Sequence, residues 1–328
     1  FFYVSYLNTK REISMEYKNN QTIVGAVLAS ILILTIVLVV SNKPKFTEGI
    51  FWQVEKDGEV VGHIYGTIHV NEERVTRISK KVMDIFNNSK GFSIEAFPSS
   101  HLWNPYHGFE NIKQRMMFKK KTLAEVAGEE TAQKVYTILT NNGVNEKYAK
   151  QIKPWAAMFS VASKSKYTGP IIDHKLLDMA SIQNKEIYQI ESPEEMLAAF
   201  YAMPMESQVS LLKDKLKSFD KMEKTLDEMI EAYLVEDLVL LTNISTNFIS
   251  KDPKKKFHRD MYFKHSIDIR NVVMAHYMNM PFLYGLDKFK GQGGTFVSVG
   301  AMHLPGKKGV LNLLEKNYGY KISRIEFK

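Results

Sequence analysis

Two histidines occupy the same short pattern near opposite ends of the chain. Residues 66–69 read Gly-Thr-Ile-His, and residues 300–303 read Gly-Ala-Met-His. Each pattern follows a short apolar run with the character of a β-strand and precedes a segment with helical spacing. Open α/β sheets bind their ligands just beyond such strand ends, where His69 and His303 would lie. Brought together, the two imidazoles could hold a metal ion or act as a general acid and base.

Each histidine motif leads through a helix to a second strand that carries a carboxylate. The helices are predicted over residues 75–87 and 308–317. The strands are predicted over residues 91–95 and 320–326, and their carboxylates are Glu95 and Glu326. The repeated unit predicts an α/β fold, with α+β as the other possibility: both units join one central mixed sheet, and the chain between them forms a helical insert.

Other polar residues could support a site built on His69, His303 and Glu95. A helix predicted over residues 260–278 carries Arg270, which could stabilise a tetrahedral oxyanion or hold a substrate carboxylate; a structural salt bridge is the alternative. Asp173 and the motif glycines Gly66 and Gly300 are candidates for a supporting shell around the ligands. The sequence contains no His-Glu-x-x-His, which excludes an ordinary zincin.

Composition narrows the class of protein. The chain has 328 residues, of which 45% are hydrophobic and 24% charged, as in a globular protein with a sizeable core. It has no cysteine, which excludes disulfides, thiolate metal ligands and a cysteine nucleophile. The net charge of +8 is spread along the chain and accompanies no nucleic-acid-binding signature, so we expect no nucleic-acid partner.

Residues 22–40 form an uncharged apolar run long enough to span a membrane. We predict a transmembrane anchor there; a cleaved signal peptide is the alternative. An N-terminal tail (1–21) would precede it, with 1–14 a possible start-site artefact because Met15 offers a compact start; a linker (41–49) and the main domain (50–328) would follow. A lone N-terminal apolar run is typical of export. We therefore expect an extracytoplasmic domain, secreted or periplasmic if the signal is cleaved.

The chain resembles the TraB/PrgY/GumN family, which includes the Tiki proteins, from about residue 46 to residue 328. Besides the first histidine motif, the resemblance rests on Ser93-Ile94-Glu95, residues 153–156 (Lys-Pro-Trp-Ala), residues 172–173 and 191–194, Arg270-Asn271, and residues 300–306 with 309–311 and 318–320. Where the family often has Gly-Asp, this chain has Glu236-Asp237.

The resemblance implies an activity and a site. Tiki proteins are membrane-anchored metalloproteases that depend on a divalent metal, and PrgY and TraB members are linked to inhibition of peptide pheromones. Carried over, His69 and His303 would be metal ligands or catalytic histidines, and Glu95 a ligand or general base. A bound Mn, Co or Zn ion would activate water to attack a carbonyl of a peptide or small-protein substrate.

Two other functions remain open at this stage. The histidines could act as acid and base in a metal-free hydrolase, as the distantly similar erythromycin-esterase-like proteins suggest. The domain could instead sequester a peptide or a cofactor such as haem without turnover. The sequence does not indicate an oligomeric state.

Overall fold

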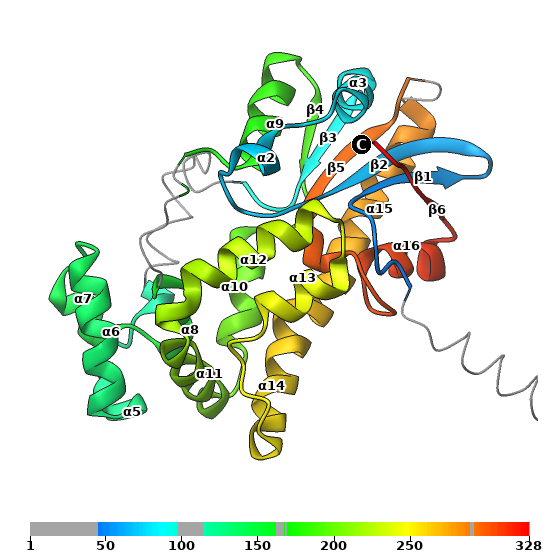
Figure 1. Ribbon diagram of the computed structural model, residues 1–328. Helices are drawn as coiled ribbons and strands as arrows, with labels where there is room; N and C mark the ends of the chain where they lie inside the picture. Colours follow the sequence, from blue (N-terminus) through cyan, green and yellow to red (C-terminus); the bar gives the residue numbers. More distant parts are fainter. Residues whose placement is uncertain (1–44, 98–113, 162–166, 168, 289–291, 328) are drawn as a thin grey trace, which may run out of the picture. The chain divides into compact units, whose positions relative to one another are not determined.

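A computed structural model describes residues 45–97, 114–161, 167, 169–288 and 292–327 (Figure 1). By its internal contacts the chain separates into residues 1–44 and residues 45–328, and the fold below is that of the second unit. The predicted tail, the predicted anchor at 22–40 and the start of the linker lie outside the described residues. Within the described ranges, none of the helices has the length and apolar character needed to cross a membrane.

The described strands form one mixed sheet in the order β4-β3-β5-β2-β1-β6 (Figure 1). In chain order they are β1 (Phe51–Lys56), β2 (Glu59–Thr67), β3 (Gly91–Ile94), β4 (Glu186–Gln189), β5 (Thr295–Gly300) and β6 (Lys321–Arg324). Neighbours among β4, β3, β5 and β2 are parallel, whereas β1 is antiparallel to both β2 and β6. The predicted α/β class with a central mixed sheet is confirmed.

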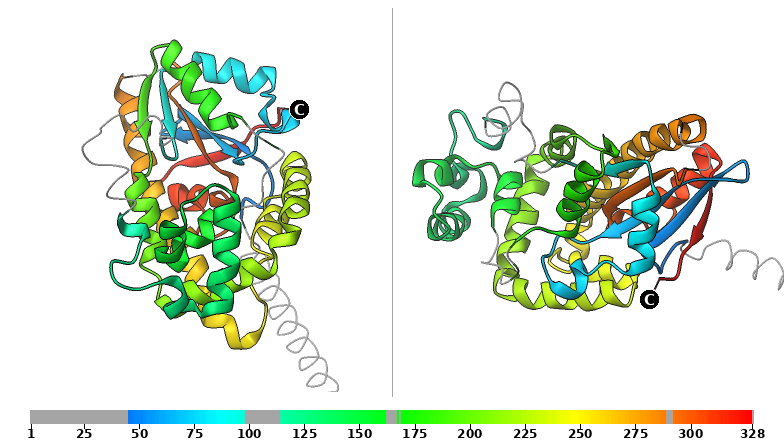
Figure 2. Two further views of the ribbon diagram at one scale, coloured as in Figure 1. Left: turned by 90° about the vertical axis from the view of Figure 1, so that its left-hand side faces the viewer. Right: turned by 90° about the horizontal axis from the view of Figure 1, so that it is seen from above.

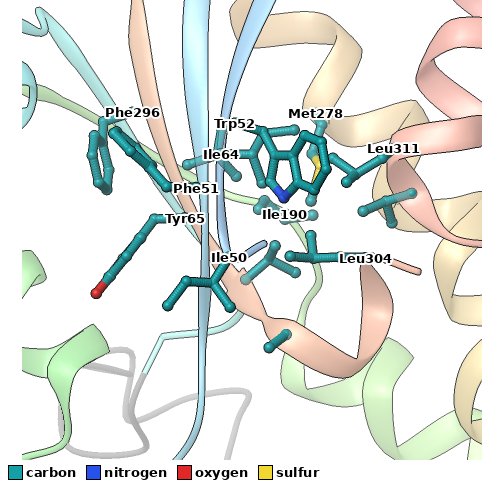
Figure 3. Close-up of a cluster of buried hydrophobic side chains, with 14 of the residues drawn as sticks. Ile50, Phe51, Trp52, Ile64, Tyr65, Ile190, Met278, Phe296, Leu304 and Leu311 are labelled. Atoms are coloured by element: carbon teal, nitrogen blue, oxygen red, sulfur yellow. The ribbon is translucent and has the colours of Figure 1, made fainter. Parts of the chain in front are cut away.

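Strands β1 and β2 form the hairpin that opens the domain. Asp57 and Gly58 connect them, both with positive φ (52° and 83°), as a two-residue turn that follows the twist of the strands requires. The alternation along β1 and β2 then places side chains on both faces of the sheet. Figure 3 shows Phe51 and Tyr65 on one side of these strands, and Trp52 on the other.

The direction of each crossover decides which face its helix covers. The steps from β2 to β3 and from β3 to β4 run toward one edge of the sheet, whereas those from β4 to β5 and from β5 to β6 run toward the other. Because crossovers between parallel strands are right-handed, the two directions put their helices on opposite faces. Accordingly, α3 (Lys80–Asn88) and α9 (Ile172–Ile182) cover one face, and α15 (Arg270–Lys288) and α16 (Val310–Tyr318) cover the other (Figure 2).

The two repeated units predicted from the sequence are placed differently in the sheet. The first unit spans one intervening strand, from β2 across β5 to β3, whereas the second runs from β5 across β2 and β1 to β6 at the far edge. Glu326 lies beyond β6 and is exposed, so the expected equivalence of Glu95 and Glu326 does not hold. The helix predicted over 75–87 is two helices, α2 (Glu73–Thr76) and α3, because the Ser79 side chain caps a new start at Lys80.

A long helical segment contains a π-helical turn. It consists of α14 (Lys256–Phe263), the π-helix η4 (Lys264–Ile269) and α15, so the helix predicted over 260–278 is too short at both ends. Helix α15 continues through Pro281, although a proline inside a helix normally kinks or ends it. Phe282 is fully buried against the sheet, and this packing outweighs the hydrogen bond that proline removes.

The helical insert has a core separate from that of the sheet. Trp155 and Leu211 are fully buried in the insert core, and Phe296 and Ile64 in the sheet core (Figure 3). Of the helices between β3 and η4, those not yet given are α5 (Leu123–Ala127), α6 (Glu129–Asn141), α7 (Glu146–Gln151), α8 (Pro154–Ser160), α10 (Pro193–Tyr201), α11 (Met205–Lys217), α12 (Met222–Leu234) and α13 (Leu238–Ser245), with the 3₁₀ turns η2 (Phe219–Lys221) and η3 (Pro253–Lys255).

Glu236 lies between α12 and α13, at the position where the family often has glycine, and its backbone conformation is one that glycine adopts easily. Its φ is 61°, in the left-handed region that a non-glycine residue adopts only at a cost. Its carboxylate accepts a hydrogen bond from Arg324 at 3.1 Å, and its carbonyl accepts one from the Gly49 N–H. The strain in the backbone of Glu236 is thus accompanied by an ion pair to Arg324, the last residue of β6.

Candidate functional site at the carboxyl ends of the parallel strands

The four parallel strands each deliver a polar residue just beyond their carboxyl ends. These are His69 after β2, Glu95 after β3, Glu191 after β4 and His303 after β5. Strands β2 and β5 are neighbours, in a register that sets Thr67 opposite Gly300, so the two histidine motifs begin side by side. The helices that follow these two strands go to opposite faces, which makes this the topological switch point where α/β sheets bind ligands.

Glu95 is the centre of a buried charge cluster. The residue is 7% exposed; Oε2 accepts a hydrogen bond from the Gly300 N–H at 2.7 Å, and Oε1 accepts one from Arg270 Nη2 at 2.7 Å. Burial alone would raise the pKa of Glu95, but His303, Arg270, His69 and the Gly300 N–H together lower it to about 2. A carboxylate this acidic is a weak base, so its environment favours a role as ligand or fixed negative charge.

Glycine at 66 and at 300 permits this close packing. A Cβ on Gly300 would stand 3.0 Å from Glu95 Oε2, crowding the carboxylate away from the N–H that it accepts from. A Cβ on Gly66 would meet the Leu304 side chain at 2.6 Å, just after the 3₁₀ turn η5 (Ala301–His303). Both glycines therefore permit the close packing of this region, and their supporting role in a site stays a prediction.

Arg270 lies between Glu95 and a second buried carboxylate, Glu191. Its Nε donates to both oxygens of Glu191 at 3.0 Å, and its Nη2 donates to Glu191 Oε2 at 2.6 Å. Burial raises the pKa of Glu191, with Arg270 acting in the opposite direction. Nη1 donates to the Ser266 carbonyl at 3.3 Å, which leaves one Nη1 hydrogen without an acceptor among the described residues. The salt-bridge interpretation of Arg270 fits this arrangement best.

His303 is held as a neutral imidazole with a defined orientation. Asn271 Nδ2 donates to the Lys308 carbonyl at 2.8 Å, so Asn271 Oδ1 faces His303 Nδ1, 2.6 Å away, and accepts its hydrogen. Nε2 is then unprotonated, and it lies 3.9 Å from Glu95 Oε1. Burial lowers the pKa of His303 to about 4, with Glu95 opposing it. Such a second hydrogen bond is the usual way to fix a metal-binding histidine.

His69 and Asp173 form a second histidine–carboxylate pair. Nε2 of His69 lies 4.0 Å from Asp173 Oδ2, and the His69 side chain is 61% exposed whereas Asp173 is buried. Asp173 Oδ1 accepts hydrogen bonds from the hydroxyls of Thr67 and Ser298. Its Oδ2 is buried and accepts no hydrogen bond from the described residues, which is rare for a buried carboxylate oxygen.

The types of side chain at this site suit a divalent metal ion, but the distances between them are longer than in a bound site. Two imidazole Nε2 atoms and two carboxylates are the ligand types that Zn, Mn and Co accept. The histidine–carboxylate separations of 3.9 and 4.0 Å exceed the roughly 3–3.5 Å expected between ligands of one ion with bonds near 2 Å. Within the described part of the chain, no three such side chains are close enough to hold a metal. The metal site therefore stays a prediction.

Sequence reasoning gave no role to several residues that complete the arrangement. Glu191 lies just beyond β4 as Glu95 lies just beyond β3, and this shared position at a strand end is the available signal. Asn271 follows Arg270 directly, but its contact with His303 depends on how α15 packs on α16. The hydroxyls of Thr67 and Ser298 meet Asp173 only because β2 and β5 are neighbours.

The fold and the site define an α/β protein with two histidine motifs at the topological switch point of its sheet. Comparison with known proteins identifies its family. The model of the TraB/PrgY/gumN family matches residues 50–324, and the chain belongs to this family. A protein of Treponema pallidum (strain Nichols), described only as uncharacterized, is 22% identical over 285 residues, which cover 82% of this chain and 81% of that protein. No solved structure matches.

Proposed function

We propose that this protein is a metal-dependent hydrolase that cleaves peptide bonds in peptides or small proteins. The observation that carries the proposal is the pairing of His303 with Glu95 and of His69 with Asp173 at the switch point, where Asp173 Oδ2 is buried and accepts no hydrogen bond from the described residues. The resemblance to Tiki metalloproteases supports the choice of a peptide substrate. Family membership by itself leaves the reaction open.

His69, His303, Glu95 and Asp173 are the residues that would hold the ion. When bound, a divalent metal supplies a water of lowered pKa and polarises a carbonyl oxygen. Asn271 keeps the Nε2 lone pair of His303 available, and Arg270 keeps Glu95 ionised and in place. His69 is the exposed member of the set, so it is the ligand placed to turn toward Asp173. The remaining Nη1 hydrogen of Arg270 is available to a substrate oxygen.

The same proposal includes a location. Residues 22–40 would anchor the chain in a membrane, with residues 50–328 outside the cytoplasm, as the uncharged apolar run supports. Membrane fractionation followed by protease treatment of intact cells tests it. Digestion of the domain from outside is expected; protection of the domain until the cells are lysed would contradict the location without affecting the proposed chemistry.

Metal analysis beside a peptide-cleavage assay tests the chemistry. The variants are His69→Ala, His303→Ala and Asp173→Asn, with His276→Ala on the exposed side of α15 as the matched histidine control. We expect about one equivalent of Mn, Co or Zn in the wild type and the control, and a large loss of metal and of hydrolysis in the other three. A wild type that takes up no metal after reconstitution would refute the metal-dependent reaction.

The His69–Asp173 pair also supports a second candidate, a metal-free hydrolase. A carboxylate that orients an exposed histidine is the usual partner of a general base. In that case hydrolysis would survive exhaustive chelation and still be lost in His69→Ala. The chelation arm of the same assay therefore separates the two reactions.

A further inference from the structure

A cavity in the helical insert has the composition of a binding site and is separate from the histidine site. It has a volume of about 380 Å³, within the range of pockets that hold small ligands. Its lining is mainly apolar and includes Phe159, Phe200, Met222, Met229 and Phe248, from helices and turns between α8 and α14. None of its lining residues belongs to the cluster around Glu95 and His303.

One amine lies among these apolar side chains. Lys215, on α11, lines the cavity, and no carboxylate is among the lining residues. In the described part of the chain no side chain forms an ion pair with its Nζ. The acidic residue beside it, Asp214, faces away and pairs with Lys255. Burial lowers the pKa of Lys215, as expected for a cation held in an apolar site without an anion.

Lys215 is half-buried, so water can still reach its amine, but a ligand that fills the apolar cavity would exclude this water and would have to supply an anion in its place. A ligand with an apolar body would bury the exposed part of Phe159, which is 45% exposed. A single negative charge on that ligand would neutralise Lys215, whereas a doubly charged phosphate would leave one charge unpaired. The hydroxyl of Ser218 also lines the cavity; it donates to the Asp214 carbonyl at 3.2 Å and would have to turn away from that carbonyl to donate to the anion.

We propose that this cavity binds an apolar ligand that ends in one carboxylate, with Lys215 as the partner of that carboxylate. An acyl-chain carboxylate and the free carboxyl terminus of a short apolar peptide share this chemistry. The inference does not depend on the proposed hydrolase activity.

Binding of decanoate to the purified full chain, measured by isothermal titration, tests the proposal. Decanol is the matched probe without charge, and tetraleucine with a free or an amidated carboxyl terminus distinguishes a peptide from an acyl chain. We expect the wild type to bind decanoate or the free-acid peptide at least tenfold more tightly than its uncharged counterpart. Equal affinity for charged and uncharged probes, or no binding of either acid, would overturn the proposal.

Variants of one helix provide the controls. Lys215→Met keeps the length of the side chain and removes its charge, so carboxylate affinity should fall about tenfold or more while decanol affinity is unchanged. Lys213→Met alters an exposed lysine on the same helix and should change neither. Lys215→Arg should recover carboxylate binding. Unaltered carboxylate affinity in a Lys215→Met protein that melts like the wild type would exclude this lysine as the partner.

Discussion

Arg270 holds two buried carboxylates, Glu95 and Glu191, with side chains that are 10% and 1% exposed. Removing one carboxylate from such a cluster leaves buried hydrogen-bond donors of the guanidinium unsatisfied in a poorly hydrated site. A surface ion pair behaves differently, because water replaces either partner at little cost. The distinction gives a stability test that does not depend on any enzymatic activity.

Glu191→Ala should lower the free energy of unfolding by about 1–3 kcal/mol, because it leaves the Nε hydrogen and one Nη2 hydrogen of the buried Arg270 without an acceptor. Glu194→Ala, three residues along the chain, removes an exposed partner of Arg115 and should cost less than about 1 kcal/mol. Denaturant unfolding of the two variants measures the difference. Equal effects would show that the buried cluster contributes no more than a surface pair.

His63 should make the protein less stable in acid. It is 7% exposed on β2 and stacks on Phe51, and burial lowers its pKa to about 4. As pH falls below the ordinary value of 6.5, the unfolded chain binds a proton that the folded chain refuses until about pH 4. The stability conferred by the neutral imidazole is thus complete above pH 6.5 and declines from there toward pH 4, by roughly 2 kcal/mol at pH 5.

His63→Phe keeps an aromatic ring against Phe51 and removes the titration. Its melting temperature should therefore fall less than that of the wild type between pH 7 and pH 5. His276→Gln, an exposed histidine, should keep the pH dependence of the wild type. A His63→Phe protein that loses stability in acid as steeply as the wild type would contradict the assignment.

At the residue scale, the sequence predicted what each strand end carries but not what those residues contact. His69, Glu95 and His303 follow strands that short-range pattern identifies, so their positions could be derived. The contacts of Arg270 with Glu191 and of Asn271 with His303 depend on how a helix packs over strands far away in the chain. Side-chain pairing of this kind has no local signal.

At the level of elements, the π-helix η4 sets the direction of Arg270 and Asn271. A π-helical turn holds one residue more than an α-helical turn. Deleting one residue would restore α-helical geometry and rotate these two side chains by roughly 100° relative to α14, since a helix has 3.6 residues per turn.

Deletion of Ile269, which is 41% exposed, should therefore break the Arg270 cluster and lower the melting temperature by many degrees. Ile269→Ala should change it little, because it removes only an exposed side chain. Thermal melts followed by circular dichroism compare the two. Similar melting temperatures would show that the packing does not require the π-helical turn.

Local pattern was reliable for strands and weaker for helix ends. The strand predicted over residues 91–95 is correct to within one residue, and that over 320–326 to within two. The helix through Pro281 and the placement of β6 at the far edge could not be predicted, because both follow from packing of Phe282 and from crossover direction. The α/β class itself needed only the order of the elements.

At the scale of the molecule, residues 45–328 form a compact unit with two hydrophobic cores. We expect a protein limited to these residues to fold with a melting temperature within a few degrees of that of the full chain, because the contacts of both cores lie inside it. Parallel melts of the two proteins measure this. Aggregation or loss of a cooperative transition in the shorter protein would show that residues 1–44 are needed for folding.

The pairing of β2 with β5 determines when, during synthesis of the chain, the two histidine motifs can come together. Thr67 and Gly300 face each other across these strands although more than 200 residues separate them along the chain. At about 5–20 residues per second, a ribosome needs on the order of ten to fifty seconds to deliver the second motif after the first. Until β5 arrives, β2 has β1 on one side and an open edge on the other. The two histidine motifs therefore meet only when synthesis is nearly complete, so a growing chain cannot use them together before then.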